Sequence, residues 1–237
     1  IRPVVAIYST FMQRAYDQII HDVALQKLPV VFALDRAGVV GEDGPTHHGA
    51  FDLSYLRNIP NLTIMVPRDE AMLQDMLYTA TRYEGGPAAL RYPRGAGVGI
   101  PLREKFAEIP IGKGEIMLQG SDIAILCVGP LVYEALQAAE RLAEEGIHPT
   151  VVDMRFVKPF DRELLAEIAA DHRYILTVEE SALEGGFGSK ILEQVSEMEH
   201  PPQVKRLGIP DRFIEQGPRK HLLHNLGLTE DGILQAV

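Results

Sequence analysis

Short apolar segments alternate with amphipathic stretches along the whole chain, and this alternation most strongly limits the folds that it can adopt. In the first part, the apolar segments are PVVAIY, PVVFAL, LTIMV and AALRY, and helical patterns cover residues 13–26 and 69–82. Strands that alternate with helices are typical of parallel sheets, because each helix returns the chain to the edge where the next strand begins. The apolar face of the second predicted helix consists of Met72, Leu73, Met76 and Leu77.

A second series of the same kind follows a stretch that is rich in glycine and proline. We expect strands near 123–128, 149–153, 173–178 and 203–207, and helices near 131–145, 161–171 and 187–198. The sequence therefore predicts an α/β protein with two consecutive, mostly parallel sheet domains that carry helices on both faces. The expected parts are a first domain at 1–100, a linker at 101–114 and a second domain at 115–237.

The first predicted strand lies at the start of the given sequence, with no helix or strand before it. An uncovered sheet edge is an aggregation hazard, so we expect another segment to cover it in the intact protein. We therefore expect the first domain to be incomplete at its amino terminus.

Charge and hydropathy narrow the range of partners. Net charge is −10, and an acidic chain is a poor binder of nucleic acid or of anionic membrane surfaces. No apolar run approaches the ~18 residues that a membrane-spanning helix needs. The single cysteine, Cys127, lies within the apolar run IAILCVG and is expected in the core. These features favour a cytoplasmic protein.

The basic residues of the first hundred positions favour a small phosphorylated ligand. Eight of these nine residues are arginine, and guanidinium groups recognise anions in a planar, bidentate way.

The loop DRAGVVGEDGPTHHGAFD, residues 35–52, follows a predicted buried strand and is the most informative segment. Ligand-binding loops lie at such carboxyl ends of parallel strands. We expect no metal site there, because no third ligand is spaced for tetrahedral coordination beside the two histidines. The loop also lacks the Gly-Lys-Ser/Thr of a P-loop.

Together with YSTFMQRAYDQIIHDVA and RYPRG, this loop resembles the 1-deoxy-D-xylulose-5-phosphate synthases of the transketolase superfamily. The resemblance continues through VVDMRFVKPFD, TVEESALEGGFGS and LGIPDRFIEQG, so it covers nearly the whole chain. It implies a pyrimidine-binding domain and a transketolase C-terminal domain of a homodimeric transferase that uses thiamine diphosphate. Such enzymes condense pyruvate with D-glyceraldehyde 3-phosphate to 1-deoxy-D-xylulose 5-phosphate and CO2, the first step of the non-mevalonate isoprenoid pathway.

The resemblance also implies roles for individual residues. Phe11 would pack against the aminopyrimidine ring of the cofactor, and Arg14 would border the cofactor pocket. Arg36 and Arg94 would hold the phosphate of the triose acceptor, with Tyr8 lining the same site. Without the resemblance, Phe11 reads as a core residue and the two arginines as surface residues paired to local acids.

Two residues of the loop would act close to the reacting atoms. His47 resembles a histidine that exchanges protons with the substrate, and Asp43 would orient the acceptor. We expect the neighbouring His48 to be exposed to solvent.

Other parts of such an enzyme have no counterpart in the sequence. The resembling enzymes use a glutamate before the first strand to activate the aminopyrimidine, and a GDG motif with a later Asn to hold Mg2+ and the diphosphate. Neither is found here, so we expect the metal ligands to lie outside this chain and the chain alone to be inactive. The expected partner is an amino-terminal, diphosphate-binding half.

The glycines of GGFGS, Gly185, Gly186 and Gly188, predict a tight turn from strand to helix. An anion bound at the start of that helix is an alternative role for the turn.

Two further functional readings remain open from the sequence. One is a small subunit of another transketolase or of a 2-oxo acid dehydrogenase, and the other is a non-catalytic dimerisation or regulatory module. The retained set of Arg36, Asp43, His47 and Arg94 argues against the second, because a pure scaffold has no physical need for it.

Overall fold

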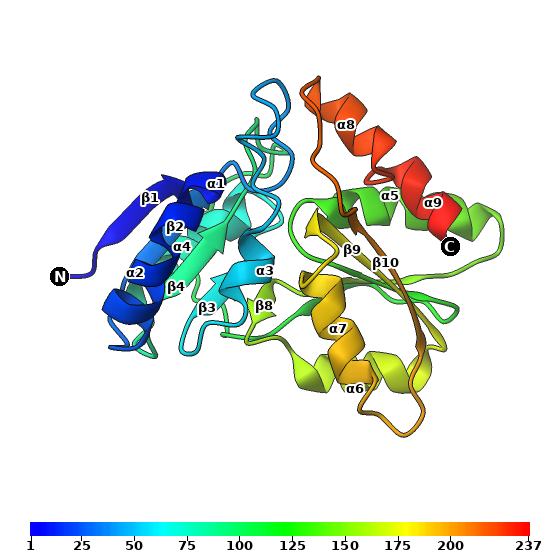
Figure 1. Ribbon diagram of the computed structural model, residues 1–237. Coiled ribbons are helices and arrows are strands. Elements are labelled where there is room, and N and C mark those ends of the chain that lie inside the picture. The colour runs from blue at the N-terminus through cyan, green and yellow to red at the C-terminus, as the bar shows by residue number, and fades with distance from the viewer.

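The computed structural model describes residues 1–237 as two α/β units side by side, each built on a five-stranded sheet (Figure 1). The fold class predicted from the sequence is confirmed: four strands of each sheet are parallel, and one edge strand is antiparallel. No helix is long and apolar enough to cross a membrane.

In spatial order, the strands of the first sheet are β1 (Val4–Tyr8), β2 (Val31–Asp35), β4 (Ala88–Arg91), β3 (Thr63–Met65) and β8 (Phe156–Lys158). The helical segments of this part are α1 (Ser9–Met12), η1 (Gln13–Ala15), α2 (Tyr16–Gln18), η2 (Ile19–Ala24), α3 (Asp52–Leu56) and α4 (Glu70–Arg82). The first four of them form one run in which the hydrogen-bond pattern changes from α to 3-10 to π. This run takes the place of the helix expected at 13–26.

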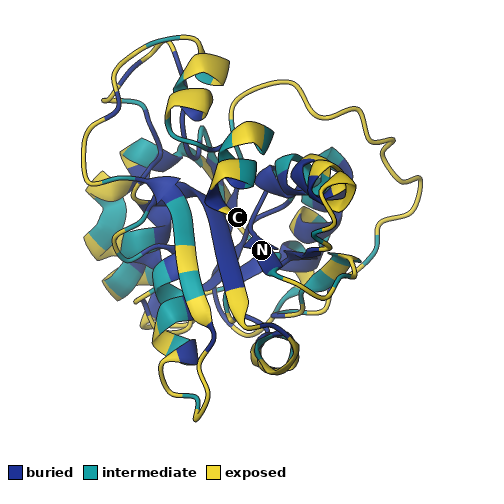
Figure 2. Cartoon of the chain, turned by 90° about the vertical axis from the view of Figure 1, so that its right-hand side faces the viewer, coloured by how far each residue is buried: buried dark blue, intermediate teal, exposed yellow.

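In spatial order, the strands of the second sheet are β10 (Gln203–Ile209), β9 (Tyr174–Ala182), β6 (Ala124–Cys127), β7 (Thr150–Asp153) and β5 (Glu115–Leu118). Its helices are α5 (Leu131–Glu144), α6 (Arg162–Asp171), α7 (Phe187–Val195), α8 (Arg219–Asn225) and α9 (Glu230–Ala236). In Figure 2, β9 is buried along its whole length after Tyr174, whereas exposed residues recur along the edge strand β10.

The start of helix α4 is fixed by a side chain close to it in the sequence. Its N-cap Asp69 accepts a hydrogen bond of 2.7 Å from the backbone N–H of Met72, which satisfies one of the free donors of the first turn. Met72 and Met76 are buried as the periodicity predicts. Leu77, which was expected on the same face, is 38% exposed. The apolar face of α4 that packs into the core is therefore narrower than the sequence predicted.

The two units are tied together more closely than a simple linker implies. Residues 101–114 contain no helix or strand, yet they run along α4, where the side chains of Asp75 and Thr79 accept hydrogen bonds from the backbone of Ala107 and Ile109. Farther along the chain, β8 leaves the second unit and pairs with β3 of the first sheet.

One apolar cluster runs through both units, so the junction between the sheets is itself part of the core. It includes Leu53 and Leu56 of α3, Leu126 of β6 and Phe187 of α7, all of which are at most 1% exposed. Cys127 is fully buried, as expected, and burial raises the pKa of its thiol. The shared core holds the carboxyl ends of the first sheet against the second unit.

Candidate functional site

Three rings meet at the carboxyl end of β1. The rings of Tyr8 and Phe11 stack with centroids 5.2 Å apart and planes 13° from parallel. The imidazole of His47 meets the Phe11 ring edge-on, with centroids 5.5 Å apart. Phe11 is 39% exposed, so part of its ring remains open to a flat ligand, and it does not plug the core.

Arg36, which directly follows β2, joins this cluster from the next strand. Its guanidinium carbon lies 3.7 Å from the centroid of the Tyr8 ring, and one of its terminal nitrogens donates to Asp35. Its Nε is buried and has no hydrogen-bond partner. Its backbone has a φ of +55°, an unusual value for a residue other than glycine, and such strain is found preferentially at functional sites.

Arg94 lies beyond the end of β4, the neighbour of β2 in the sheet. Its Nη1 donates to the Asp43 carboxylate over 2.5 Å, and both side chains remain half exposed. Arg94 also lines a cleft of about 580 Å3 between the two units. Arg36 and Arg94 therefore occupy adjacent strand ends at the same edge of the sheet.

The loop that carries Asp43 and His47 is anchored to α1 and closed by a turn. The carbonyl of Gly44 accepts hydrogen bonds from the backbone N–H groups of both His47 and His48. The hydroxyl of Thr10 donates to the carbonyl of Thr46 over 3.1 Å. These contacts hold the His47 ring beside Phe11.

The prediction that His48 is exposed is wrong, because it is only 4% exposed. Its Nδ1 accepts a hydrogen bond of 2.9 Å from the backbone N–H of Val40. The other ring nitrogen lies 3.3 Å from the carbonyl oxygen of Glu215 and must therefore carry the proton that it donates. His48 connects the loop to the second unit.

Arg14 is the expected site residue that the structure does not tie to the cluster. It lies in η1, close to Phe11 in sequence, and its side chain is exposed. Tyr8, Phe11, Arg36, Asp43, His47 and Arg94 thus come together at one edge of the first sheet, whereas Arg14 stays outside their contacts.

A buried ion pair beneath the loop was not anticipated from the sequence. The Nε of Arg91 lies 2.8 Å from both carboxylate oxygens of Asp52, which also accepts a hydrogen bond of 2.9 Å from the hydroxyl of Ser9. Arg91 further donates to the carbonyls of Gly49 and Glu180. An arginine inside the apolar strand AALRY was the available signal, because a buried charge needs a partner.

Glu180 and Arg219 of the second unit form hydrogen bonds with the backbone of the loop at Val39. One oxygen of the buried Glu180 carboxylate accepts a hydrogen bond of 2.7 Å from the backbone N–H of Val39. Arg219 donates to the same carboxylate and, through its Nε, to the carbonyl of Val39. Gly38 is required here, because a Cβ at this position would lie 2.5 Å from Glu180 and its φ is +76°.

The glycine-rich turn at 185–188 opens α7, as predicted, but its amino terminus is already filled. The carboxylate of the buried Glu179 accepts hydrogen bonds of 2.7 Å from the backbone N–H groups of Phe187 and Gly188. The alternative role predicted for this turn, binding of an external anion, is therefore wrong, because Glu179 already accepts hydrogen bonds from these N–H groups. Burial raises the pKa of Glu179 to about 7, although these N–H groups and Arg91 act in the opposite direction.

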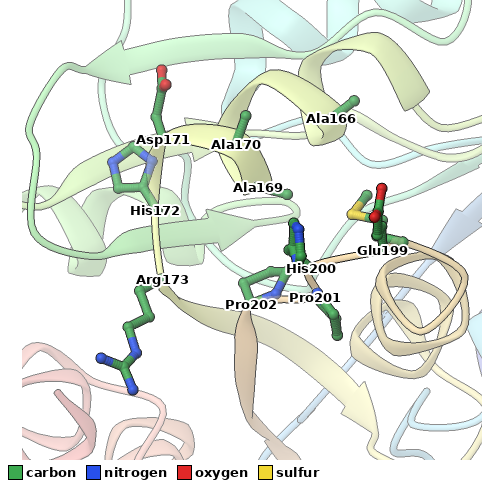
Figure 3. A pocket seen from close by; sticks show the side chains of 11 residues that line it. Ala166, Ala169, Ala170, Asp171, His172, Arg173, Glu199, His200, Pro201 and Pro202 are labelled. Carbon is green, nitrogen blue, oxygen red and sulfur yellow. The ribbon is translucent and has the colours of Figure 1, made fainter.

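Another surface pocket, of about 1020 Å3, lies between the end of α6, the start of β9 and the turn before β10 (Figure 3). Asp171 and Arg173 point away from one another in this view, and the ring of His172 is bonded to Thr150 and to the carbonyl of Ile168. The polar side chains that line this pocket do not point toward a common position. No group of three His, Cys, Asp or Glu side chains is arranged to hold a metal ion anywhere in the structure.

Two family models match the chain. The pyrimidine binding domain of transketolase matches residues 1–98, and the transketolase C-terminal domain matches residues 112–233. The curated 1-deoxy-D-xylulose-5-phosphate synthase 1 of Geobacter sulfurreducens is 60% identical over 99% of this chain and 37% of its own length. The synthase of Syntrophus aciditrophicus is 60% identical over 100% of this chain and 36% of its own. The chain thus spans little more than a third of these relatives.

Solved structures agree with these matches. A split gene transketolase, described as an inactive beta4 tetramer, has a TM-score of 0.86 and 34% identity, over 99% of this chain and 74% of that one. A transketolase from Campylobacter jejuni has a TM-score of 0.77 and covers 98% of this chain, but at 20% identity it supports the fold alone.

Proposed function

The chain belongs to the transketolase family, and from this premise we propose that it contributes the acceptor side of a 1-deoxy-D-xylulose-5-phosphate synthase. The proposed reaction condenses pyruvate with D-glyceraldehyde 3-phosphate, and releases CO2, with thiamine diphosphate as the cofactor. The observation that carries the proposal is the convergence of stacked rings, one imidazole and two arginines at adjacent strand ends.

The open part of the Phe11 ring suits the flat aminopyrimidine of thiamine diphosphate. When bound, this cofactor supplies the carbanion chemistry of the reaction. We assign Arg14 to the border of the same pocket, on its place in η1. The GDG motif with a later Asn that holds Mg2+ and the diphosphate in the resembling enzymes has no counterpart in this sequence, so we assign the metal and the diphosphate to residues outside these 237.

Arg36 and Arg94 are proposed to bind the phosphate of the triose. The buried Nε of Arg36 has no partner, which leaves a donor that an anionic oxygen would satisfy. Arg94 is paired to Asp43 over 2.5 Å, and a phosphate dianion would compete for that guanidinium. Tyr8, which lies under the Arg36 guanidinium, would line the same subsite.

His47 is proposed to exchange protons with substrate oxygens, since imidazole is the side chain best suited to this near neutral pH. Its contact with the edge of Phe11 would place it beside the cofactor ring. Asp43, released from Arg94 when phosphate binds, would orient the hydroxyl of the acceptor.

We assign residues 1–100 to the pyrimidine-binding domain, 101–114 to the linker and 115–237 to the C-terminal domain. The working enzyme is proposed to be a cytoplasmic homodimer that also contains a diphosphate-binding half. By this assignment, the chain has no synthase activity by itself.

A chimera tests the proposal. Residues 1–237 would replace the matching segment of the Geobacter sulfurreducens relative, and CO2 release from pyruvate would be measured with and without glyceraldehyde 3-phosphate. We expect acceptor-dependent turnover from the chimera and none from the isolated chain. An inactive but folded chimera, or turnover by the isolated chain, would contradict the assignment.

A second candidate is the small subunit of a two-chain transketolase, because the split gene transketolase is 34% identical over 74% of its chain. The same chimera separates the two. Transfer of two carbons from a ketose phosphate, without CO2 release from pyruvate, would favour this candidate.

A further inference from the structure

Four basic side chains line one small cavity at the junction of the two units. The cavity has a volume of about 350 Å3 and is lined by Arg57, Lys158, Arg162 and Lys190 together with Val157, Pro159 and Phe160. We call it the seam cavity. Such a gathering of cations is unexpected by chance in a chain whose net charge is −10.

The four cations come from four different elements that the fold brings together. Arg57 follows α3, Lys158 ends β8, Arg162 begins α6 and Lys190 lies in α7. Figure 1 shows α3 and β8 at the junction of the two units, and α7 and α6 below them in the second unit. The cavity is therefore a product of the tertiary structure and not of a local charge run.

Only one carboxylate neutralises this group. Glu193 accepts hydrogen bonds from Arg57, and it lies 3.7 Å from the Lys190 ammonium. Asp161, although next to Arg162 in sequence, is bonded to the N–H groups of Gly114 and Leu164 and to Lys113. Four cations against one carboxylate leave an excess of three positive charges.

Two of the cations have donors to spare. Arg57 is occupied by Glu193 and the carbonyl of Gly185, and Lys158 donates to the carbonyls of Arg57 and Ile59. The side chain of Arg162 forms no hydrogen bond or ion pair, and that of Lys190 forms only the long contact with Glu193.

Arg162 and Lys190 both lie near the ring of Phe160, and all three residues line the seam cavity. The Arg162 guanidinium carbon lies 5.7 Å, and the Lys190 nitrogen 5.4 Å, from the centroid of Phe160. Burial lowers the pKa of Lys158, and the charges of Lys190 and Arg57 lower it further. This repulsion is what a bound anion would relieve.

We propose that the seam cavity binds a compact phosphate-type anion, either inorganic or the phosphate group of a small metabolite. Arg162 and Lys190 are its direct ligands, and Lys158 and Arg57 supply supporting charge. A guanidinium beside an ammonium suits phosphate, because the first donates in a planar fork and the second acts as a point charge. The anion would bridge the two units.

Calorimetric titration of the 237-residue chain with inorganic pyrophosphate tests the proposal. Arg162→Gln and Lys190→Gln should each weaken binding about tenfold, because each removes a charge-assisted contact, and the double variant should abolish it. Lys105→Gln with Arg173→Gln removes the same charge from exposed positions away from the cavity. This control should bind as the original chain does.

The proposed acceptor subsite also attracts phosphate, so the two sites must be separated. Hydrogen exchange should show protection at 156–163 and 187–195, and binding there should survive Arg36→Gln with Arg94→Gln. The proposal is overturned by absent binding at millimolar pyrophosphate, by binding that only the acceptor variants remove, or by equal loss in the charge-matched control. Titration with glycerol 2-phosphate distinguishes a phosphate monoester from an inorganic ligand.

Discussion

The carboxylate of Glu180 accepts a hydrogen bond of 2.7 Å from the backbone N–H of Val39, 141 residues away in the chain. Val39 lies in the loop that carries Asp43 and His47, and its carbonyl is bonded to Arg219, which pairs with the same carboxylate. The second unit therefore binds both backbone polar groups of one loop residue, Val39. The loop is positioned by a domain that contributes none of the proposed reacting groups.

Glu180→Gln tests this coupling. The glutamine oxygen can still accept the Val39 N–H, but the amide NH2 then faces the Arg219 guanidinium, and Arg219 loses its charged partner, so we expect a stability loss of about 1–3 kcal/mol. Hydrogen exchange in residues 36–50 should become faster. Glu184→Gln, an exposed change in the turn after β9, is the control. Equal exchange in the two variants would show that Glu180 does not restrain the loop.

Arg94→Ala, in the active chimera, separates acceptor binding from cofactor binding. Loss of one charge-assisted phosphate contact should raise the KM for glyceraldehyde 3-phosphate by roughly ten- to 150-fold and leave thiamine diphosphate affinity nearly unchanged. Phe11→Ala should show the reverse pattern, because its ring is assigned to the cofactor. Arg82→Ala removes an exposed arginine paired to Glu108 and should alter neither constant. If Arg94→Ala weakens both ligands equally, Arg94 is structural.

Glu179 predicts a pH dependence of stability. Its pKa is raised to about 7 in the folded protein, mainly by burial, against about 4.5 for an ordinary glutamate. The folded state thus binds the proton more tightly, so the resulting stabilisation is complete below about pH 4.5 and is lost as the pH rises through 7. Relative to Glu179→Gln, the original chain should lose on the order of 3 kcal/mol across this interval. Urea unfolding at several pH values measures the difference, and parallel curves would contradict the assignment.

Arg68 connects the units at a second place. It forms ion pairs with Asp69 of its own unit and with Glu115 and Asp153 of the second, and Asp153 is fully buried. Burial raises the pKa of Asp153 to about 6, and Arg68 acts against this. Arg68→Ala should therefore destabilise the fold by about 3–5 kcal/mol, because it leaves a buried carboxylate without its partner.

A double-mutant cycle tests whether this loss comes from the unpaired carboxylate of Asp153. Adding Asp153→Asn to Arg68→Ala should recover part of the loss, since the buried charge is then removed. The exposed pair formed by Arg82 and Glu108 supplies a matched control, for which thermal unfolding should change little. Additive effects of Arg68→Ala and Asp153→Asn would show that the two residues are not coupled.

Several elements escaped the sequence analysis for identifiable reasons. β5, β8 and α3 are only three to five residues long, too short to display a period. The exposure predicted for His48 failed because its burial depends on Val40 and on Glu215, far away in the chain. The alternative of an anion at the start of α7 failed because the carboxylate of Glu179 already reaches the helix from the preceding strand.

The sequence by itself determined the order of strands and helices, the parallel character of both sheets and the placement of Arg36 and Arg94 at strand ends. These features follow from local periodicity and from the rule that consecutive parallel strands end at the same edge. Only the tertiary structure decided that Glu180 and Arg219 hold the loop, and that four cations meet in the seam cavity. Such contacts join residues many positions apart in the chain, and their geometry depends on how the two units pack, which no local pattern records.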